Sequence, residues 1–379
     1  MFNINDYDYT LPQELIAQHP CDKADECKLL IVDDNGIKDL QFKEIENIID
    51  KNTVMFLNNT KVIKSRIPLI NVKVYSDKSS REKKIDKGEL FFLKMIDTNK
   101  FEALVYPGKK FQVGHVLVLG GYELKVLEIT LEGRIFETNC PDIEELLDRI
   151  GQMPLPPYIK YSKDKEHPYQ TIFAAKSGST ASPTASLHFT KELINNIEEK
   201  GIIIEYGTLH IGLGTFKKVD VEKIKDYDIH KEQVEFDLNI FQKIESIKKS
   251  NKKILSIGTT ITRSLESLPY LRKINKIGKN EYRDNLTKEI TIEQAKEFIH
   301  NIIIENNIIK FETKLFIYPG RKFYITDELI TNFHLPKSSL LMLVSAFVGF
   351  NETKQIYEYA INNNYRFFSF GDAMYIKLK

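Results

Sequence analysis

The spacing of apolar residues along the chain predicts two regions with different patterns of helices and strands. Residues 39–50 place their apolar side chains on one helical face, and residues 54–57 form an apolar run typical of a buried strand. After residue 150, helical and strand patterns alternate. Further helices are expected over residues 191–200, 239–250, 259–268, 291–306, 338–347 and 352–363. Further strands are expected over residues 202–206, 253–257, 314–318, 366–370 and 374–378. This alternation predicts a layered α/β body.

The segment of residues 66–150 has a different pattern, in which short apolar runs are separated by turn residues. Strands are expected over residues 69–75, 89–96, 101–106, 116–119, 122–129 and 134–137, followed by a helix over 142–150. The pair Gly120-Gly121 separates two of these strands, which is a strong hairpin signal. The expected fold class is therefore α+β. A layered α/β body of residues 1–65 and 151–379 carries a small inserted antiparallel β-barrel domain, residues 66–150.

The amino-acid composition excludes few classes of function. The 379 residues include 54 Lys and Arg against 53 Asp and Glu, so a nucleic-acid partner would need a local basic patch. Cys21, Cys27 and Cys140 match no metal-binding spacing, which predicts no metal site and a reducing cytoplasm. The longest uncharged apolar run, residues 338–350, is too short to cross a bilayer of about 30 Å, so no membrane association is expected.

Two loops rich in small and hydroxyl-bearing residues, 178–190 and 208–216, are the strongest candidates for a binding site. Their candidate residues are Ser179, Pro183, Thr184, His188, His210, Gly212, Gly214 and Thr215. Small residues let a ligand approach the backbone, and hydroxyls supply adaptable hydrogen bonds. A histidine is the usual proton carrier near neutral pH, although each histidine alone also fits a structural hydrogen-bonding role.

Two further segments carry polar candidates. Gly258-Thr259-Thr260 lies between a predicted strand and a predicted helix, where exposed N–H groups and hydroxyls can hold an anion or a ribose. A plain strand–helix turn with a threonine cap explains the same residues. Asn332 and His334 lie in another loop of apolar and polar residues.

Basic residues recur in two similar turns. Lys109-Lys110 and Arg321-Lys322 each follow a Tyr-Pro-Gly sequence and precede a phenylalanine. The similarity fits either convergent turn chemistry or two basic clamps that contact one polyanion. Residues 77–87 are also rich in cations, and they fit either a solvated loop or a contact with RNA phosphates.

Several motifs together resemble the S-adenosylmethionine:tRNA ribosyltransferase-isomerases of queuosine biosynthesis. They lie in order along most of the chain, at residues 7–18, 151–159, 169–171, 178–190, 209–216, 258–260, 331–336, 340–347 and 365–374. Among them are Thr-Leu-His-Ile-Gly-Leu-Gly-Thr-Phe at 208–216 and Thr-Asn-Phe-His-Leu-Pro at 331–336. The chain departs from the family pattern at Asn59, Tyr227 and Arg321.

This resemblance implies both a fold and a reaction. The fold is an α/β body with an inserted β-barrel. The reaction transfers and isomerises the ribosyl part of S-adenosylmethionine onto 7-aminomethyl-7-deazaguanine at the wobble position of tRNA, giving epoxyqueuosine with release of adenine and methionine. S-adenosylmethionine is then a co-substrate, no metal or bound cofactor is expected, and the expected state is a cytoplasmic monomer.

The resemblance also suggests roles for the candidate residues. His188 or His210 is expected to be the acid or base, while hydroxyls such as Ser179, Thr184 and Thr215 orient substrate. Asn332 and His334 are expected to close the pocket. Two other functions remain open: another S-adenosylmethionine-dependent RNA enzyme, such as a methyltransferase, and an RNA-binding protein whose chemistry has lapsed.

Overall fold

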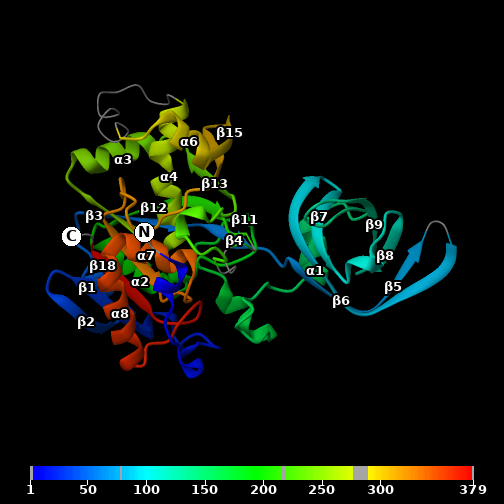
Figure 1. Cartoon of the computed structure of the whole chain (residues 1–379), viewed down its shortest axis with the longest axis horizontal. Helices are drawn as coiled ribbons and strands as arrows, with labels where there is room; N and C mark the ends of the chain where they lie inside the picture. Colours follow the sequence, from blue (N-terminus) through cyan, green and yellow to red (C-terminus); the bar gives the residue numbers. More distant parts are fainter. Residues whose placement is uncertain (1–2, 77–78, 213, 215–218, 276–288, 378–379) are drawn as a thin grey trace. The chain divides into compact units, whose positions relative to one another are not determined.

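The computed structural model describes residues 3–76, 79–212, 214, 219–275 and 289–377, with the side chains of residues 79–83 left aside. The chain divides into two compact units (Figure 1). The body comprises Met1–Lys61, Pro156–Lys176 and Ser182–Lys379, and the barrel unit comprises Val62–Leu155 and Ser177–Ala181. The domain boundaries expected from the sequence, before residue 66 and after residue 150, lie within about five residues of the ends of the main barrel segment.

A ten-stranded mixed sheet forms the body. Its strands are β1 (Lys28–Asp33), β2 (Gly36–Gln41), β3 (Thr53–Asn58), β12 (Ile203–His210), β13 (Glu232–Asp237), β14 (Lys253–Ile257), β15 (Ile299–Glu305), β16 (Ile308–Thr313), β17 (Glu328–Asn332) and β18 (Ala373–Lys377). They lie in the order β15-β16-β13-β12-β3-β14-β17-β18-β1-β2. The four central strands β12, β3, β14 and β17 are parallel, so their carboxyl ends meet at one edge of the sheet. Two shorter strands, β4 (Thr60–Val62) and β11 (Lys176–Ser179), pair separately.

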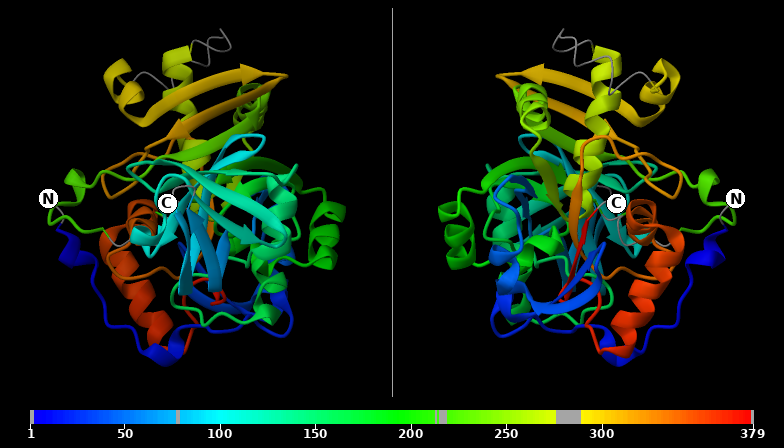
Figure 2. Two further views of the ribbon diagram at one scale, coloured as in Figure 1. Left: turned by 90° about the vertical axis from the view of Figure 1, so that its right-hand side faces the viewer. Right: turned by 90° about the vertical axis from the view of Figure 1, so that its left-hand side faces the viewer.

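Helices cover this sheet and bury its apolar side chains. They are α2 (Lys191–Glu199), α3 (Ile240–Lys249), α4 (Thr259–Asn275), α6 (Ile292–Phe298), α7 (Ser339–Val348) and α8 (Phe350–Asn362). Local sequence fixes several of their starts: the Thr190 and Ser338 hydroxyls accept from the N–H groups of Leu193 and Leu341. At one end of the sheet, α4 and α6 pack beside the ribbon of β15 and β16 (Figure 2).

The barrel unit is a closed antiparallel barrel with one helix. Its elements are β5 (Arg66–Ser76), β6 (Ser79–Asp97), β7 (Lys100–Tyr106), β8 (His115–Leu119), β9 (Tyr122–Ile129), β10 (Arg134–Thr138) and α1 (Ile143–Ile150). The barrel closes in the order β10-β7-β6-β5-β8-β9. Phe101, Phe111 and Phe136 fill its core, and the predicted Gly120-Gly121 turn joins β8 to β9. The predicted α+β class is confirmed.

Five predicted elements are wrong in the structure. Residues 299–305 form β15 instead of extending α6, because they pair with β16. Residues 39–41 belong to β2 and are followed by 3₁₀ turns instead of a long helix. Residues 314–318 and 366–370 are not strands, and the latter segment makes only a single bridge to the N-terminal region. Residues 79–87 lie in β6 instead of a loop. For residues 299–305 and 79–87, tertiary pairing outweighs local propensity.

Within the described residues, no helix is both long enough and apolar enough to span a membrane.

Candidate active site

Polar side chains gather where the central parallel strands of the body end. Asn58 ends β3, His210 ends β12 and Asn332 ends β17. Gly258 follows β14 with φ +94°, a conformation that favours glycine, and the N-terminus of α4 comes next. In open α/β sheets, ligands bind at the carboxyl ends of the strands. The sequence candidates from three separate motifs, at residues 208–216, 258–260 and 331–336, therefore come together at one edge.

His210 is held between a hydroxyl and a carboxylate. Its Nδ1 lies 2.9 Å from Thr60 Oγ1, and its Nε2 lies 3.9 Å from Glu235 Oε1. Glu235 also receives Lys176 Nζ at 2.9 Å and Lys310 Nζ at 3.3 Å. The pKa of Glu235 is lowered to about 2. His210 makes the largest contribution and the two ammonium groups add to it, and together they outweigh partial burial, which acts to raise the pKa. Glu235 is therefore ionised across the physiological range and places a fixed negative charge beside the imidazole.

Asn58 connects His210 to the first turn of α4. Its Oδ1 accepts from the backbone N–H groups of Thr60 and Leu209, both at 3.1 Å. Its Nδ2 donates to Leu209 O at 3.0 Å and to Thr260 Oγ1 at 3.3 Å. Because Asn58 is completely buried, these bonds fix the relative positions of the His210 backbone and the Thr260 hydroxyl.

A small cavity opens against the first turns of α4. It is lined by Ile229, His230, Glu232, Thr259, Thr260, Arg263, Leu315, Phe316, Ile317, Ser339, Leu340 and Leu343. One wall therefore presents hydroxyl and charged groups, and the other is apolar. A helix N-terminus supplies free N–H groups to such a cavity. This combination suits a ligand that has both hydroxyl groups and an apolar part.

A buried ion pair forms the polar wall of this cavity. Arg263 Nη1 contacts Glu232 Oε2, and Arg263 Nη2 donates to His230 O and Thr313 O, both at 3.0 Å. The other Glu232 oxygen lies 3.2 Å from His230 Nε2. Burial lowers the pKa of Arg263, while the charge of Glu232 acts in the opposite direction. The network holds His230 and Arg263 rigidly at the cavity.

On the other side of the edge, Asn332 is held in one orientation by three partners. Its Nδ2 donates to the Asp372 carbonyl at 3.3 Å and to His188 Nε2 at 3.0 Å, and its Oδ1 accepts from Thr184 Oγ1 at 2.8 Å. Because a carbonyl can only accept, the amide group must face Asp372, so His188 Nε2 must be the unprotonated nitrogen. His188 is thus a neutral imidazole that orients Asn332.

His188 is enclosed by the body instead of being exposed to a ligand. It is 5% exposed, its Nδ1 lies 3.0 Å from Cys27 Sγ, and its ring packs against Phe42. Burial, followed by the charge of Arg366, lowers the pKa of His188 to about 4, although a hydrogen bond to the Ala24 backbone opposes the shift. This position favours a role in orienting Asn332 over the direct proton transfer expected from the sequence.

His334 is also buried, next to a second and larger cavity. Its Nε2 lies 2.8 Å from Thr331 Oγ1, and burial lowers its pKa to about 3. Its backbone carbonyl accepts from the Tyr9 hydroxyl, and its backbone N–H donates to the Tyr357 hydroxyl at 2.9 Å. The imidazole of His334 is only 8% exposed. His334 can therefore help to close a pocket through its backbone contacts with Tyr9 and Tyr357, and not through its side chain.

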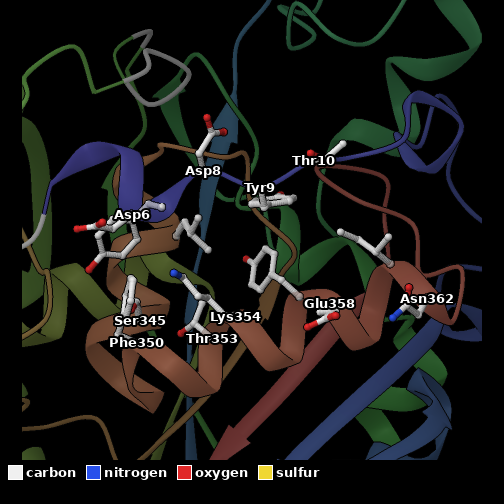
Figure 3. Close-up of a pocket in the computed structure, with 14 residues that line it drawn as sticks. Asp6, Asp8, Tyr9, Thr10, Ser345, Phe350, Thr353, Lys354, Glu358 and Asn362 are labelled. Atoms are coloured by element: carbon white, nitrogen blue, oxygen red, sulfur yellow. The ribbon is translucent and has the colours of Figure 1, made fainter.

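The second cavity, of about 430 Å³, lies between the N-terminal segment and α7 and α8 (Figure 3). Tyr9, Phe350 and Tyr357 provide aromatic walls, and Lys354 and Glu358 line it from α8. None of the residues expected from the sequence to bind substrate lines this cavity. In open α/β sheets ligands bind at the carboxyl ends of the strands, and the polar candidates converge there, so the candidate active site lies at the strand edge.

Some expected site residues do not join this set. Ser179 belongs to the barrel unit, where it is buried and its hydroxyl donates to Ala181 O at 2.8 Å. Pro183 is buried at the start of a 3₁₀ turn. A Cβ at Gly212 would meet no atom within 4 Å, whereas one at Gly214 would lie 2.4 Å from the His230 ring. Thr215 lies outside the described residues.

The two similar basic turns differ in their surroundings. Lys109 is exposed on the barrel unit, and the Lys110 ammonium donates to Lys84 O at 2.7 Å. In the body, the Arg321 guanidinium stacks over the rings of Phe298 and Tyr318, at 4.9 and 5.2 Å from their centroids, and Lys322 pairs with Glu289 at 3.0 Å. The two turns therefore are not equivalent cationic clamps.

Sequence reasoning missed five residues of this site: Asn58, Thr60, Glu232, Glu235 and Arg263. The two glutamates belong to β13, a strand that the apolar pattern did not predict, where Glu232 pairs with Arg263 and Glu235 lies beside His210. Arg263 lies one helical turn after Thr259-Thr260, a spacing that would have placed it on the same side of α4. Thr60 lay in a segment that was interpreted only as a turn.

Comparisons with known proteins agree with this geometry. Residues 4–376 match the model of a family described as "Queuosine biosynthesis protein". The chain is 40% identical, over 99% of both chains, to the S-adenosylmethionine:tRNA ribosyltransferase-isomerase of Clostridium kluyveri. It is also similar to the crystal structure of S-adenosylmethionine tRNA ribosyltransferase from Thermotoga maritima. That similarity has a TM-score of 0.50 and 27% sequence identity, and it covers 98% of this chain and 99% of that one.

The family model and the full-length relative lead to the same assignment as the sequence motifs. A match that spans nearly the whole chain covers both the body and the barrel unit. The chain belongs to the queuosine biosynthesis protein family.

Proposed function

We propose that this protein is an S-adenosylmethionine:tRNA ribosyltransferase-isomerase. It transfers and isomerises the ribosyl moiety of S-adenosylmethionine onto 7-aminomethyl-7-deazaguanine at the tRNA wobble position, and releases adenine and methionine. The observation that carries the proposal is the 40% identity, over 99% of both chains, to a relative of that name. The polar groups collected at the strand edge support it, because the reaction needs a proton carrier beside hydroxyl-binding groups.

In this proposal, His210 is the proton carrier of the two histidines expected from the sequence. The reaction requires removal of a proton next to the sulfonium, and an imidazole is suited to that step. Thr60 fixes the ring through Nδ1, and the Glu235 carboxylate lies 3.9 Å from Nε2, the nitrogen that would take the proton. The carboxylate charge of Glu235 stabilises the imidazolium that forms when His210 accepts the proton. Lys176 and Lys310 keep Glu235 ionised.

The first turn of α4 would hold the ribose. The Thr259 and Thr260 hydroxyls and the free N–H groups at this helix end can bind ribose oxygens or a developing negative charge. Asn58 fixes the Thr260 hydroxyl at a constant position relative to His210. The sugar would therefore be presented to the base in a defined orientation, which lowers the entropic part of the barrier.

Thr184 would contact the opposite end of the substrate, with Asn332 and His188 as positioning residues, because Asn332 is only 2% exposed. His188 Nε2 accepts from the Asn332 amide and the Asn332 oxygen accepts from the Thr184 hydroxyl, so these bonds fix the position of that hydroxyl. A protonated His188 could not accept this bond. The role of His188 is therefore to keep Asn332 in one orientation, and it requires the neutral imidazole that its depressed pKa provides.

The proposal is tested by identifying the small molecules released from S-adenosylmethionine in the presence of tRNA that carries the aminomethyl precursor. Adenine and methionine are expected. S-adenosylhomocysteine would indicate a methyltransferase, and tRNA binding without any release would indicate a lapsed enzyme. His210→Ala is expected to lose adenine release. The matched control is His167→Ala, because His167 is exposed.

A further inference from the structure

The barrel unit carries its charges unevenly. Residues 64–76 and 84–110 contain nine Lys and Arg against four Asp and Glu, whereas residues 111–155 contain three against eight. The first set belongs to β5, β6, β7 and the turn after β7, and these three strands are neighbours in the closed barrel. The cations are therefore concentrated on one side of the barrel.

Five of these nine cations form ion pairs with nearby carboxylates, and three others lie close together along the chain and the strands. The paired ones are Lys64, Arg66, Lys84, Lys94 and Lys100. Within the described part of the barrel unit, Lys87, Lys109 and Lys110 pair with no carboxylate. Lys109 and Lys110 lie in the turn after β7, and Lys110 donates to the backbone carbonyl of Lys84 at 2.7 Å, three residues before Lys87 on β6, so the three lysines lie near the same turn.

Strand register places an aromatic ring on the same face. Tyr106 pairs with Glu89, and Ile70 pairs with Lys87, two residues from Glu89 along β6. Paired residues, and residues two apart, point to the same face of a sheet. Tyr106 and Ile70 are each 70% exposed, so this is the outer face of the barrel. An exposed tyrosine thus lies on the same face as Lys87, and Glu89, the carboxylate opposite the ring, is paired with Arg66 at 2.7 Å.

The turn that carries these residues is held rigidly. Arg134 donates to the carbonyls at both ends of the turn, to Gly108 O at 3.3 Å and to Phe111 O at 2.9 Å. Gly88 lets β6 lie directly against it, because a Cβ there would be 2.5 Å from Tyr106 O. A ligand that binds here does not have to order the turn, which reduces the entropic cost of binding.

We propose that Tyr106, Lys87, Lys109 and Lys110 form an RNA-binding surface for an unpaired segment of tRNA. An exposed base stacks on the Tyr106 ring, and the three ammonium groups hold the adjoining phosphates. The inference rests on the proposed function, which supplies tRNA as the substrate. It assigns the basic turn of the barrel unit to recognition, whereas its counterpart at Arg321 has a structural role.

Two pairs of full-chain variants test this surface in fluorescence anisotropy with a labelled, unmodified tRNA transcript. Tyr106→Leu should weaken binding about 5- to 150-fold, as expected for loss of one stacked base, while Tyr106→Phe should bind like the wild type. Lys87→Ala/Lys109→Ala should lower the slope of log K against log salt by about 2, one unit for each lost phosphate contact. The charge-matched control, Lys100→Ala/Lys125→Ala, should leave the slope unchanged.

Equal binding by Tyr106→Leu and Tyr106→Phe, or equal salt slopes for the two double variants, would overturn the inference. Adenine release by the wild-type protein with precursor-bearing tRNA is measured in parallel. If the wild type releases adenine but the variants bind tRNA as the wild type does, the proposed RNA-binding surface is refuted and the proposed function stands. If the variants bind tRNA more weakly but the wild type releases no adenine, the RNA-binding surface is supported and the proposed reaction is refuted.

Discussion

Lowering the pH should destabilise the body through His188. This histidine stays neutral in the folded state until about pH 4, whereas in the unfolded chain it takes up a proton near pH 6.5. Between these values the unfolded state binds more protons, so the free energy of unfolding falls as the pH falls. From pH 7.5 to pH 5, the two pKa values give a loss of about 2 kcal/mol from His188 alone.

His188→Gln removes this contribution while keeping an acceptor for Asn332. His334, whose pKa is lowered to about 3, adds a similar loss in both proteins and cancels in the comparison. Glu235 also cancels, because its lowered pKa matters only as the pH falls below about 4.5. The free energy of unfolding should be measured by urea titration at pH 7.5 and pH 5. The variant should lose about 2 kcal/mol less than the wild type between the two pH values.

The exposed His167 supplies the control, and His167→Gln should lose as much as the wild type. An equal loss in His188→Gln and wild type would show that His188 is not a buried neutral imidazole. The assignment of His188 as the residue that orients Asn332 would then be refuted.

Three further substitutions probe the strand edge. Glu235→Gln should reduce adenine release by roughly 10- to 100-fold with little change in the S-adenosylmethionine KM, because the charge beside His210 acts on proton transfer; an unchanged kcat would count against that role. Arg263→Met should destabilise the body by roughly 3–5 kcal/mol in urea unfolding, since it leaves the Glu232 carboxylate buried without its cation; a loss below 1 kcal/mol would contradict the ion pair. Thr184→Val should lower kcat/KM about tenfold and Thr184→Ser should preserve it, because only the hydroxyl is needed; equal kinetics for the two variants would exclude this role.

Local sequence was sufficient to predict the barrel and much of the body. The barrel strands alternate in apolarity and are separated by glycine turns, so each strand is visible without knowledge of its neighbours. Residues 299–305 were misassigned because their helical pattern continues that of α6, whereas pairing with β16 decides their conformation. The strand β13 was missed because Glu232 and Glu235 interrupt its apolar pattern, and both are buried against cations from other elements, Arg263 and Lys176.

The same reasoning explains which site residues could be predicted. Histidines and hydroxyl-rich loops stand out in a sequence, so His210, Thr184 and Asn332 could be predicted as candidates from the sequence alone. Their partners come from distant segments: Thr60 lies 150 residues from His210 along the chain. The burial of His188 could not be predicted either, because it depends on Phe42 and Cys27 packing around the ring. Sequence thus indicates the chemical groups, whereas the fold decides which of them face a substrate.

The central claim is that this chain catalyses ribosyl transfer from S-adenosylmethionine through His210. The most direct measurement is the rate of adenine release from S-adenosylmethionine with tRNA that carries the aminomethyl precursor, for the wild type, His210→Ala and His167→Ala. The account predicts adenine release by the wild type and the His167 variant, and a loss of at least about 100-fold in the His210 variant, the lower range for a general base. Undiminished release by His210→Ala, or S-adenosylhomocysteine in place of adenine, would contradict it.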